Sequence, residues 1–248
     1  MTPTRKFTIT AGVLVFVLGV IVIFPARVAY NGFAPDVVQM SGLHGTAWSG
    51  SAAEMSVSGV YLRDVAWQVK PLRLLTGKVA LDLEATPTSG FVEASVALGF
   101  GGVIRVSNLS GSVPLQLFAG PLRMPGLAGN SSLQFESIVV RDGIPTEVEG
   151  TFAVASLVAP MIDSNRTQLG SYRAEFMTTE SGVIASVEDS GAVFDLAGSL
   201  TLSPDRSFLF LGQVAATDQT PEKLRQQLRF LGTPNERGQH EVRFEGSL

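Results

Sequence analysis

The chain has 248 residues, no cysteine and a formal net charge of −4 at pH 7. The lack of cysteine excludes disulfides and thiolate metal sites, and a mildly acidic chain without a basic block argues against nucleic acid as a partner. The 26 glycines favour a β-rich chain with many turns over a helical one.

The first long apolar stretch runs from residue 7 to residue 24 and contains no charged residue. As a helix, its 18 residues would extend roughly 27 Å, close to the roughly 30 Å of a hydrocarbon core. Arg5 and Lys6 precede it and Pro25 follows it. Basic residues before an apolar helix predict a cytoplasmic end at 1–6, a transmembrane anchor at 7–24 and translocation of the rest.

Two other interpretations of this stretch stay open. A cleaved signal peptide would have an apolar region of about 7–15 residues before a small-x-small cleavage site. Here the stretch is longer, and cleavage after Ala29 or Ala26 would leave Arg27 or Phe24 where a small residue is needed. A buried core helix would need a pattern that fits packing inside a globular domain, and this stretch has no polar face at any helical phase.

The rest of the chain is dominated by runs in which apolar and polar residues alternate. Alternation of period two is typical of strands in an antiparallel sheet with one wetted face. The apolar residues of these runs are Val65, Trp67 and Val69; Val79, Leu81 and Leu83; Val92, Ala94, Val96 and Leu98; Phe194, Leu196, Leu200 and Leu202; and Val242 and Phe244. The predicted fold class is mainly β, with an N-terminal transmembrane helix followed by a long antiparallel, twisted β-sheet.

Two parts of this β region resemble each other in the order of their motifs. Gly45-Thr46-Ala47-Trp48 has a counterpart in Gly150-Thr151-Phe152, and Gly77-Lys78-Val79-Ala80 has one in Gly182-Val183-Ile184-Ala185. This pattern predicts a sheet of two similar meander halves. The expected organisation is a connector at 25–42, a first half at 43–118, a linker with the first strand of the second half at 119–144, and a second half at 145–248.

One short C-terminal helix is predicted within the second half, at residues 221–231. Thr220 is a candidate N-cap and Gly232 a candidate helix end. Leucines at positions i, i+4 and i+7 share one helical face: Leu224, Leu228 and Leu231.

No catalytic, cofactor-binding or metal-binding constellation is found in the sequence. His44 and His240 are the only histidines and lie far apart. The run Gly99-Phe100-Gly101-Gly102 lacks the Lys-Ser/Thr that follows in a phosphate-binding loop, and no serine lies in a Gly-x-Ser-x-Gly elbow. Asp163 and Asp195, or Glu84 and Glu93, could pair in space, but solvated strand faces carry such residues too. We therefore expect no enzyme activity, no cofactor and no metal.

The two tryptophans, Trp48 and Trp67, allow two interpretations. Each lies close to a glycine or proline boundary. A tryptophan usually anchors a core, where it buries a large area and hydrogen-bonds its indole. The alternative is an exposed aromatic that binds a partner.

Four groups of motifs follow one another along the chain. The first is a short N-terminal end with an anchor that finishes in Phe24-Pro25-Ala26-Arg27. The others are Leu43-His44-Gly45-Thr46-Ala47-Trp48-Ser49-Gly50, then the run from Trp67 to Gly77, then Leu231-Gly232-Thr233-Pro234 with Gly238 and the tail 242–248. In this order they resemble protein N of the bacterial type II secretion system. The residues that carry the resemblance, as structural or interface residues, are Gly45, Thr46, Trp48, Gly50, Trp67, Pro71, Leu74, Gly77, Leu231, Gly232, Gly238, Phe244 and Gly246. Phe152 departs from the pattern, since a second tryptophan is expected there.

This resemblance implies a location and a function. The location is the inner membrane, crossed once, with a cytoplasmic N-terminus and a periplasmic β domain. The function is that of a non-enzymatic scaffold or assembly subunit that assists export of folded proteins through the outer-membrane secretin. The implied partners are the inner-membrane proteins C, L and M and membrane lipid, with the secretin as a further candidate.

A second family resemblance leads to an alternative function. Repeated meanders after a single anchor also resemble the AsmA-like proteins, whose long curved sheets form an apolar trough. Under this alternative the chain would bind or transfer lipid or another hydrophobic ligand, and the stripes around Val79–Leu83 and Val92–Leu98 would line the trough.

Overall fold

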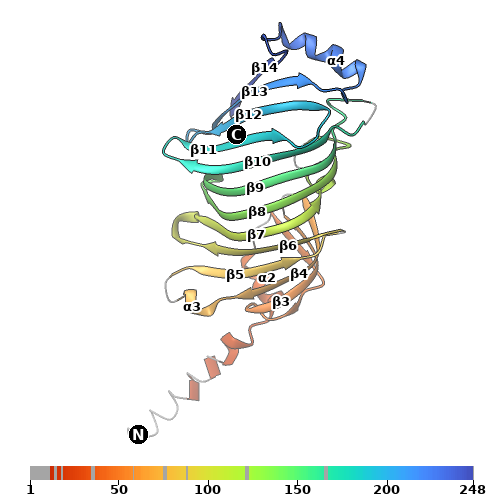
Figure 1. Ribbon diagram of the computed structural model, residues 1–248. Coiled ribbons are helices and arrows are strands. Elements are labelled where there is room, and N and C mark those ends of the chain that lie inside the picture. Colours follow the sequence, from red (N-terminus) through yellow and green to blue (C-terminus); the bar gives the residue numbers. More distant parts are fainter. Residues whose placement is uncertain are drawn as a thin grey trace, which may run out of the picture.

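The computed structural model describes residues 12–13, 16–17, 19–34, 37–57, 59–74, 77–87, 89–120, 123–164 and 167–247. Within them, one 14-stranded antiparallel sheet dominates the fold, and its strand order follows the chain (Figure 1). The short strand β2 pairs beside β3. The strands are β1 (Val38–Ser41), β2 (His44–Gly45), β3 (Ser49–Val57), β4 (Val60–Val69), β5 (Val79–Ala85), β6 (Phe91–Leu98), β7 (Ile104–Pro114), β8 (Ala128–Arg141), β9 (Ile144–Val158), β10 (Gly170–Thr179), β11 (Gly182–Asp189), β12 (Phe194–Leu202), β13 (Ser207–Ala216) and β14 (His240–Ser247). The prediction of one long antiparallel sheet is confirmed.

Helices are few and short in the described part of the chain. Besides the helical positions between 12 and 22, they are α2 (Ala26–Phe33), α3 (Pro71–Leu74) and α4 (Glu222–Leu228), with single 3₁₀ turns η1 (Phe100–Gly102), η2 (Leu115–Phe118) and η3 (Arg229–Leu231). The region expected as a connector at 25–42 thus contains a helix and the edge strand β1. The predicted C-terminal helix is present as α4 continued by η3.

The expected anchor lies partly outside the described residues, which omit 7–11, 14–15 and 18. The described positions from 12 to 22 are helical, and most of their side chains are exposed. No helix among the described residues is both long enough and apolar enough to cross a membrane.

The strand register gathers the apolar side chains on one face of the sheet. Across β4, β5 and β6, Val69 lies beside Leu81 and Leu81 beside Val96. Across β11, β12 and β13, Ala185 lies beside Leu200 and Leu200 beside Phe210. We call this side the apolar face and the other, which carries residues such as Asp82 and Glu93, the polar face. The alternation recognised in the sequence therefore continues in register over most of the sheet.

Aromatic rings cover glycines of neighbouring strands on the apolar face. Gly150 lies between Phe135 and Phe176 in the register, and the two rings meet with centroids 5.6 Å apart. Gly50 lies opposite Trp67, and a Cβ on it would be 2.5 Å from Cζ2 of the indole. Glycine leaves room for a ring to lie over the backbone, which explains why a β chain so rich in glycine buries apolar surface.

One hairpin shows how turn chemistry sets the register. Asp142 and Gly143 form the two-residue connection between β8 and β9, with φ of 51° and 80°. Both values are positive, as a type I′ turn requires, and Asp-Gly is a favoured pair for it. Arg141 and Ile144 consequently face each other across the hairpin.

Helix α4 packs by two leucines against the loops beside β10 and β12. Leu224 is fully buried in a cluster with Leu169 and Val193, and Leu228 is buried as well. Leu231 was expected on the same face but is 43% exposed, because the chain leaves the α-helix at Leu228.

The prediction that Thr220 caps the N-terminus of this helix was wrong. Thr220 is buried, and its hydroxyl donates to the Val193 carbonyl oxygen and accepts from the Thr217 amide. The residue before the helix is Pro221, which makes no side-chain cap. The hydroxyl fixes the loop to the sheet end instead.

A single-layered sheet leaves much of the chain in contact with solvent. The accessible surface is 15647 Å², whereas a compact monomer of this mass exposes about 10,600 Å². Most side chains of the apolar face are half-buried, shielded by their neighbours on adjacent strands. Many side chains of the sheet therefore remain accessible to solvent.

Candidate functional site

An apolar hollow lies between α2 and the first strands of the sheet. Its volume is about 350 Å³, and α2, β1, β3, β4 and β5 all contribute to its wall. The side chains around it include Ala29 and Phe33 of α2, Met40 of β1, Trp67 of β4 and Leu81 of β5. This wall is almost entirely hydrocarbon and aromatic, so the hollow suits an apolar occupant.

The hydroxyl of Tyr30 holds α2 over this hollow. It donates to the carbonyl oxygen of Val38 at 3.2 Å and accepts from the amide of Met40 at 3.1 Å. Both partners belong to β1, whose outer edge is otherwise unpaired within the described residues. The helix is thus fastened to the strand at one edge of the sheet.

Helix α2 was missed by the sequence analysis, although a signal for it exists. Ala26, Ala29, Tyr30 and Phe33 follow the spacing i, i+3, i+4, i+7, which is typical of one helical face. The Asn31-Gly32 pair within it favours a turn instead when the sequence is read alone. Eight residues are too few for the helix to form alone, so its packing on the sheet decides the outcome.

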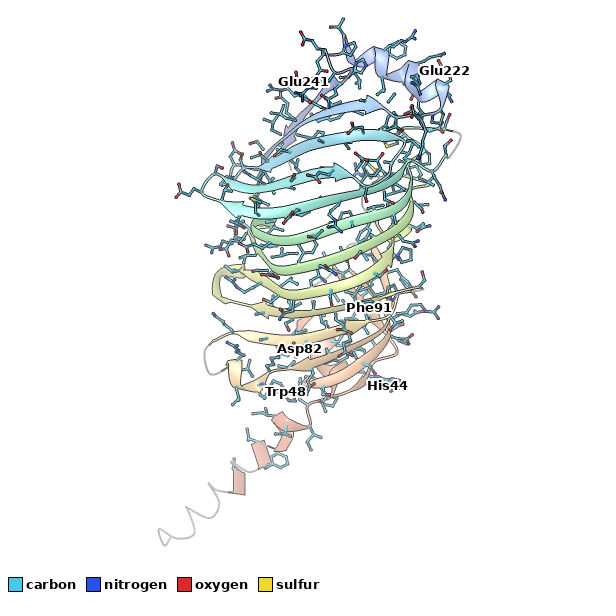
Figure 2. The ribbon with its side chains drawn as sticks, viewed as in Figure 1. His44, Trp48, Asp82, Phe91, Glu222 and Glu241 are labelled. Atoms are coloured by element: carbon cyan, nitrogen blue, oxygen red, sulfur yellow. The ribbon has the colours of Figure 1, made fainter. Side chains whose placement is uncertain are left out.

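The first eight motif residues gather at the end of the sheet near the N-terminal helix. They occupy β2, β3, β4 and the connections next to them: Gly45, Thr46, Trp48, Gly50, Trp67, Pro71, Leu74 and Gly77. Thr46 Oγ1 accepts hydrogen bonds from the amides of Trp48 and Ser49, at 3.3 Å and 3.1 Å, and so shapes the turn into β3. Figure 2 places Trp48 and His44 at this end.

The two tryptophans of this group have different environments. Both are half-buried. Trp67 packs over Gly50 and borders the apolar hollow. The indole of Trp48 donates to the carbonyl oxygen of Ile21 at 2.7 Å, so it links the sheet to the N-terminal helical residues.

The remaining motif residues lie at the opposite end of the sheet. Leu231 ends η3, and Gly232 and Gly238 have φ of 103° and 76° in the connection to β14. Phe244 lies on β14, and a Cβ on its neighbour Gly246 would be 2.8 Å from the Phe208 ring. The motifs therefore form two separate groups and not one site.

The last strand leaves an open edge beside exposed apolar side chains. In the described part of the chain, β14 pairs only with β13. Phe244 on its apolar face is 62% exposed, and nearby in the chain Phe230 of η3 is 89% exposed. We call Phe230, Leu231 and Phe244 the C-terminal apolar patch. Leu231 and Phe244 are among the predicted motif residues, whereas no motif of the sequence includes Phe230.

In the described part of the chain, the polar face carries acidic side chains on neighbouring strands. Glu84 and Glu93 are direct register partners on β5 and β6, as the sequence analysis considered. The described residues contain no cluster of three or more potential metal ligands. Lys70 forms an ion pair with Asp82 at 2.7 Å, and this bond together with one from Ser95 lowers the pKa of the Asp82 carboxyl.

Comparisons with known proteins agree with the motif resemblance. Residues 36–243 match the family described as type II secretion system (T2SS), protein N. The chain is 25% identical to a type II secretion system protein N of Aeromonas hydrophila, over 98% of this chain and 99% of that protein. It is 27% identical to a protein of the same name from Vibrio cholerae serotype O1, over 94% and 95% of the two chains.

A third relative, from Pectobacterium carotovorum, has the same name and is 24% identical over 90% of each chain. No solved structure matches this chain. The family match covers both groups of motifs except the last residues of the tail, and it spans nearly the whole sheet. The chain therefore belongs to the type II secretion system protein N family.

Proposed function

We propose that this chain is a non-enzymatic scaffold or assembly subunit of a type II secretion system. Residues 7–24 anchor it in the inner membrane with a cytoplasmic N-terminus, and the sheet lies in the periplasm. There it assists the export of folded proteins across the outer membrane. Family membership and the charge-free apolar segment after Arg5 and Lys6 support this proposal.

The observation that carries the scaffold function is the open edge of β14 with the C-terminal apolar patch beside it. A partner strand that pairs with β14 would satisfy its outward backbone groups and cover Phe244. Glu241, Arg243 and Glu245 lie on the polar face of this strand and discourage unselective pairing. The partners in this proposal are the inner-membrane proteins C, L and M, and the secretin is a further one.

Co-purification from membranes tests this function. In mild detergent, we expect Phe244→Glu and Phe230→Glu to lose the secretion partners that the unaltered full chain retains. Phe91→Glu is the matched control, because Phe91 is 47% exposed on β6 of the polar face, far from β14. All three variants should unfold at nearly the temperature of the unaltered chain. Retention of every partner by both patch variants would refute the proposal.

A second function, the binding or transfer of lipid in an apolar trough, is favoured by a different observation. The apolar face continues in register across most of the sheet, and its N-terminal end contains the 350 Å³ hollow beneath α2. A half-buried apolar face and a hollow without charged side chains in its wall suit acyl chains.

Lipid analysis of the purified full chain tests this second function. We expect stoichiometric phospholipid, and less of it in Ala29→Phe, whose ring would occupy the hollow. Ala197→Phe is the matched control, since Ala197 is exposed on the polar face of β12. If the unaltered chain contains no lipid beyond the detergent background, the trough has no such function.

A further inference from the structure

The connection between β4 and β5 combines exposed leucines with basic side chains. Leu72 is 78% exposed and Leu74 is 38% exposed, both in α3. Lys70, Arg73 and Lys78 lie beside them in the same connection. Apolar side chains flanked by lysine and arginine are typical of segments that lie on a membrane surface.

Hydrogen bonds place this connection at the foot of the N-terminal segment. The amide of Ala47 donates to the carbonyl oxygen of Phe24 at 2.8 Å, and the Trp48 indole donates to that of Ile21 at 2.7 Å. The next bond runs from the amide of Val69 to the carbonyl oxygen of Trp48, at 2.7 Å. Lys70 follows directly, so the connection starts beside the segment that would enter the bilayer. Figure 1 shows α3 at this same end of the sheet.

A basic hollow of about 560 Å³ opens beside the connection. Four cations contribute to its wall, namely Lys70, Arg73, Lys78 and Arg105 of β7, and no acidic residue does. Two of these cations also form ion pairs, Lys70 with Asp82 at 2.7 Å and Arg105 with Glu147 at 3.9 Å. The residues after position 24 carry 16 basic and 22 acidic side chains, so they are acidic as a whole. Four cations around one hollow are therefore an unusual local concentration of positive charge.

We propose that the β4–β5 connection is a second membrane contact, in which Leu72 enters the bilayer interface and the basic hollow binds the phosphate of an anionic phospholipid headgroup. The proposal rests on the anchoring by residues 7–24 proposed above. Cations near an anionic leaflet gain Coulomb energy, and an exposed leucine gains from leaving water. Two contacts on one side would fix the orientation of the sheet relative to the membrane, which a single helix leaves free.

Spin labels on single cysteines test this contact, because the natural chain contains no cysteine. The full chain would be placed in nanodiscs of phosphatidylcholine with or without phosphatidylglycerol. Leu72→Cys reports the contact and Val17→Cys reports the anchor. Phe230→Cys is the control at the far end, where the side chain is 89% exposed. Access of oxygen relative to a water-soluble nickel chelate measures the immersion of each label.

We expect the labels at 17 and 72 to favour oxygen and the label at 230 to favour the nickel chelate. Immersion at 72 should be lost without phosphatidylglycerol and in Lys78→Glu or Arg73→Glu, and it should persist in Arg237→Glu, an exposed charge reversal near β14. If the label at 72 is in water while the label at 17 is immersed, the proposed membrane contact is wrong and the proposed anchor still holds. A label at 17 in water would overturn the anchor itself.

One further outcome would replace the lipid by a protein. If the label at 72 is in water in nanodiscs but becomes protected when the secretion partners are added, an acidic protein segment occupies the basic hollow. The proposal of a lipid headgroup would then be wrong.

Discussion

The indole Nε1 of Trp48 donates a hydrogen bond to the backbone carbonyl oxygen of Ile21 across 2.7 Å. Ile21 lies in the last turn of the N-terminal helical residues, and its carbonyl oxygen also accepts from the amide of Phe24 at 3.3 Å. One side chain of the sheet thus caps the segment proposed to be the anchor. The bond couples the direction of that segment to the direction of the strands.

Trp48→Phe should therefore loosen the junction more than it destabilises the sheet. Phenylalanine keeps an aromatic ring but cannot donate, so we expect a loss of about 0.5–1.5 kcal/mol in unfolding free energy. The larger effect should be a broader distance distribution between spin labels at positions 17 and 91. Trp67→Phe is the control, because it leaves the donor to Ile21 in place. An unchanged distribution in Trp48→Phe would show that the bond does not orient the segment.

Gly50→Ala should destabilise the sheet through a steric clash. A Cβ at this position would lie 2.5 Å from Cζ2 of Trp67 and 2.5 Å from the carbonyl oxygen of His44. Overpacking of this kind costs about 1–3 kcal/mol. Gly120→Ala is the control, since no atom lies within 4 Å of its Cβ position. Urea unfolding should give a lower midpoint for Gly50→Ala alone, and equal midpoints would contradict the predicted clash.

Glu93→Gln should stabilise the chain, because Glu93 lies directly opposite Glu84. Like charges that face each other across a strand pair are destabilising, so we expect a gain of roughly 0.2–1 kcal/mol in unfolding free energy. High salt screens exposed charges and should reduce this gain. Glu136→Gln, at an irregularity of β8, is the control. A gain that persists at high salt would point to a cause other than charge repulsion.

Tyr172 should make the fold sensitive to alkali. Burial, and secondarily the nearby Asp189 carboxylate, raises the pKa of its phenol to about 12. A folded-state pKa above the unfolded value means that the unfolded chain ionises first, so this contribution to stability is complete below about pH 10 and is lost as the pH rises towards 12. Because Tyr172 is only half-buried, solvent screening makes this loss smaller than the full pKa shift would imply.

Comparison with Tyr172→Phe measures this contribution. The variant also loses the hydrogen bond to the Leu169 carbonyl oxygen, so it should be less stable at neutral pH, and the difference should shrink above pH 10. The hydrogen bond to the Glu54 carboxylate raises the pKa of Tyr61. Glu54→Gln therefore serves as the control. It should shift the pKa of Tyr61 back towards its ordinary value and leave the pKa of Tyr172 unchanged. A constant stability difference from pH 9 to pH 12 would refute the assignment.

Local pattern determined much of this protein before any fold was considered. The alternation around Val79–Leu83 predicts strands because side chains of a strand alternate between faces, and this rule needs no partner. The leucines at 224 and 228 predict a helix for an equally local reason. The motifs between Leu43 and Gly77 and at the C-terminus led to the family that the comparisons then confirmed. The division into two similar halves stays a prediction.

Only the tertiary structure decided which of these pieces meet. Helix α2 forms because Tyr30 and its neighbours pack on the sheet, and the hydroxyl of Thr220 bonds to Val193, 27 residues away. The basic hollow brings Lys70 together with Arg105, and the register separates the two groups of motifs to opposite ends of the sheet. Each of these outcomes depends on strand order and sheet curvature, and both result from many contacts between residues far apart in the sequence. The order of residues within a short stretch of about ten does not specify which distant strands pair or how the sheet curves.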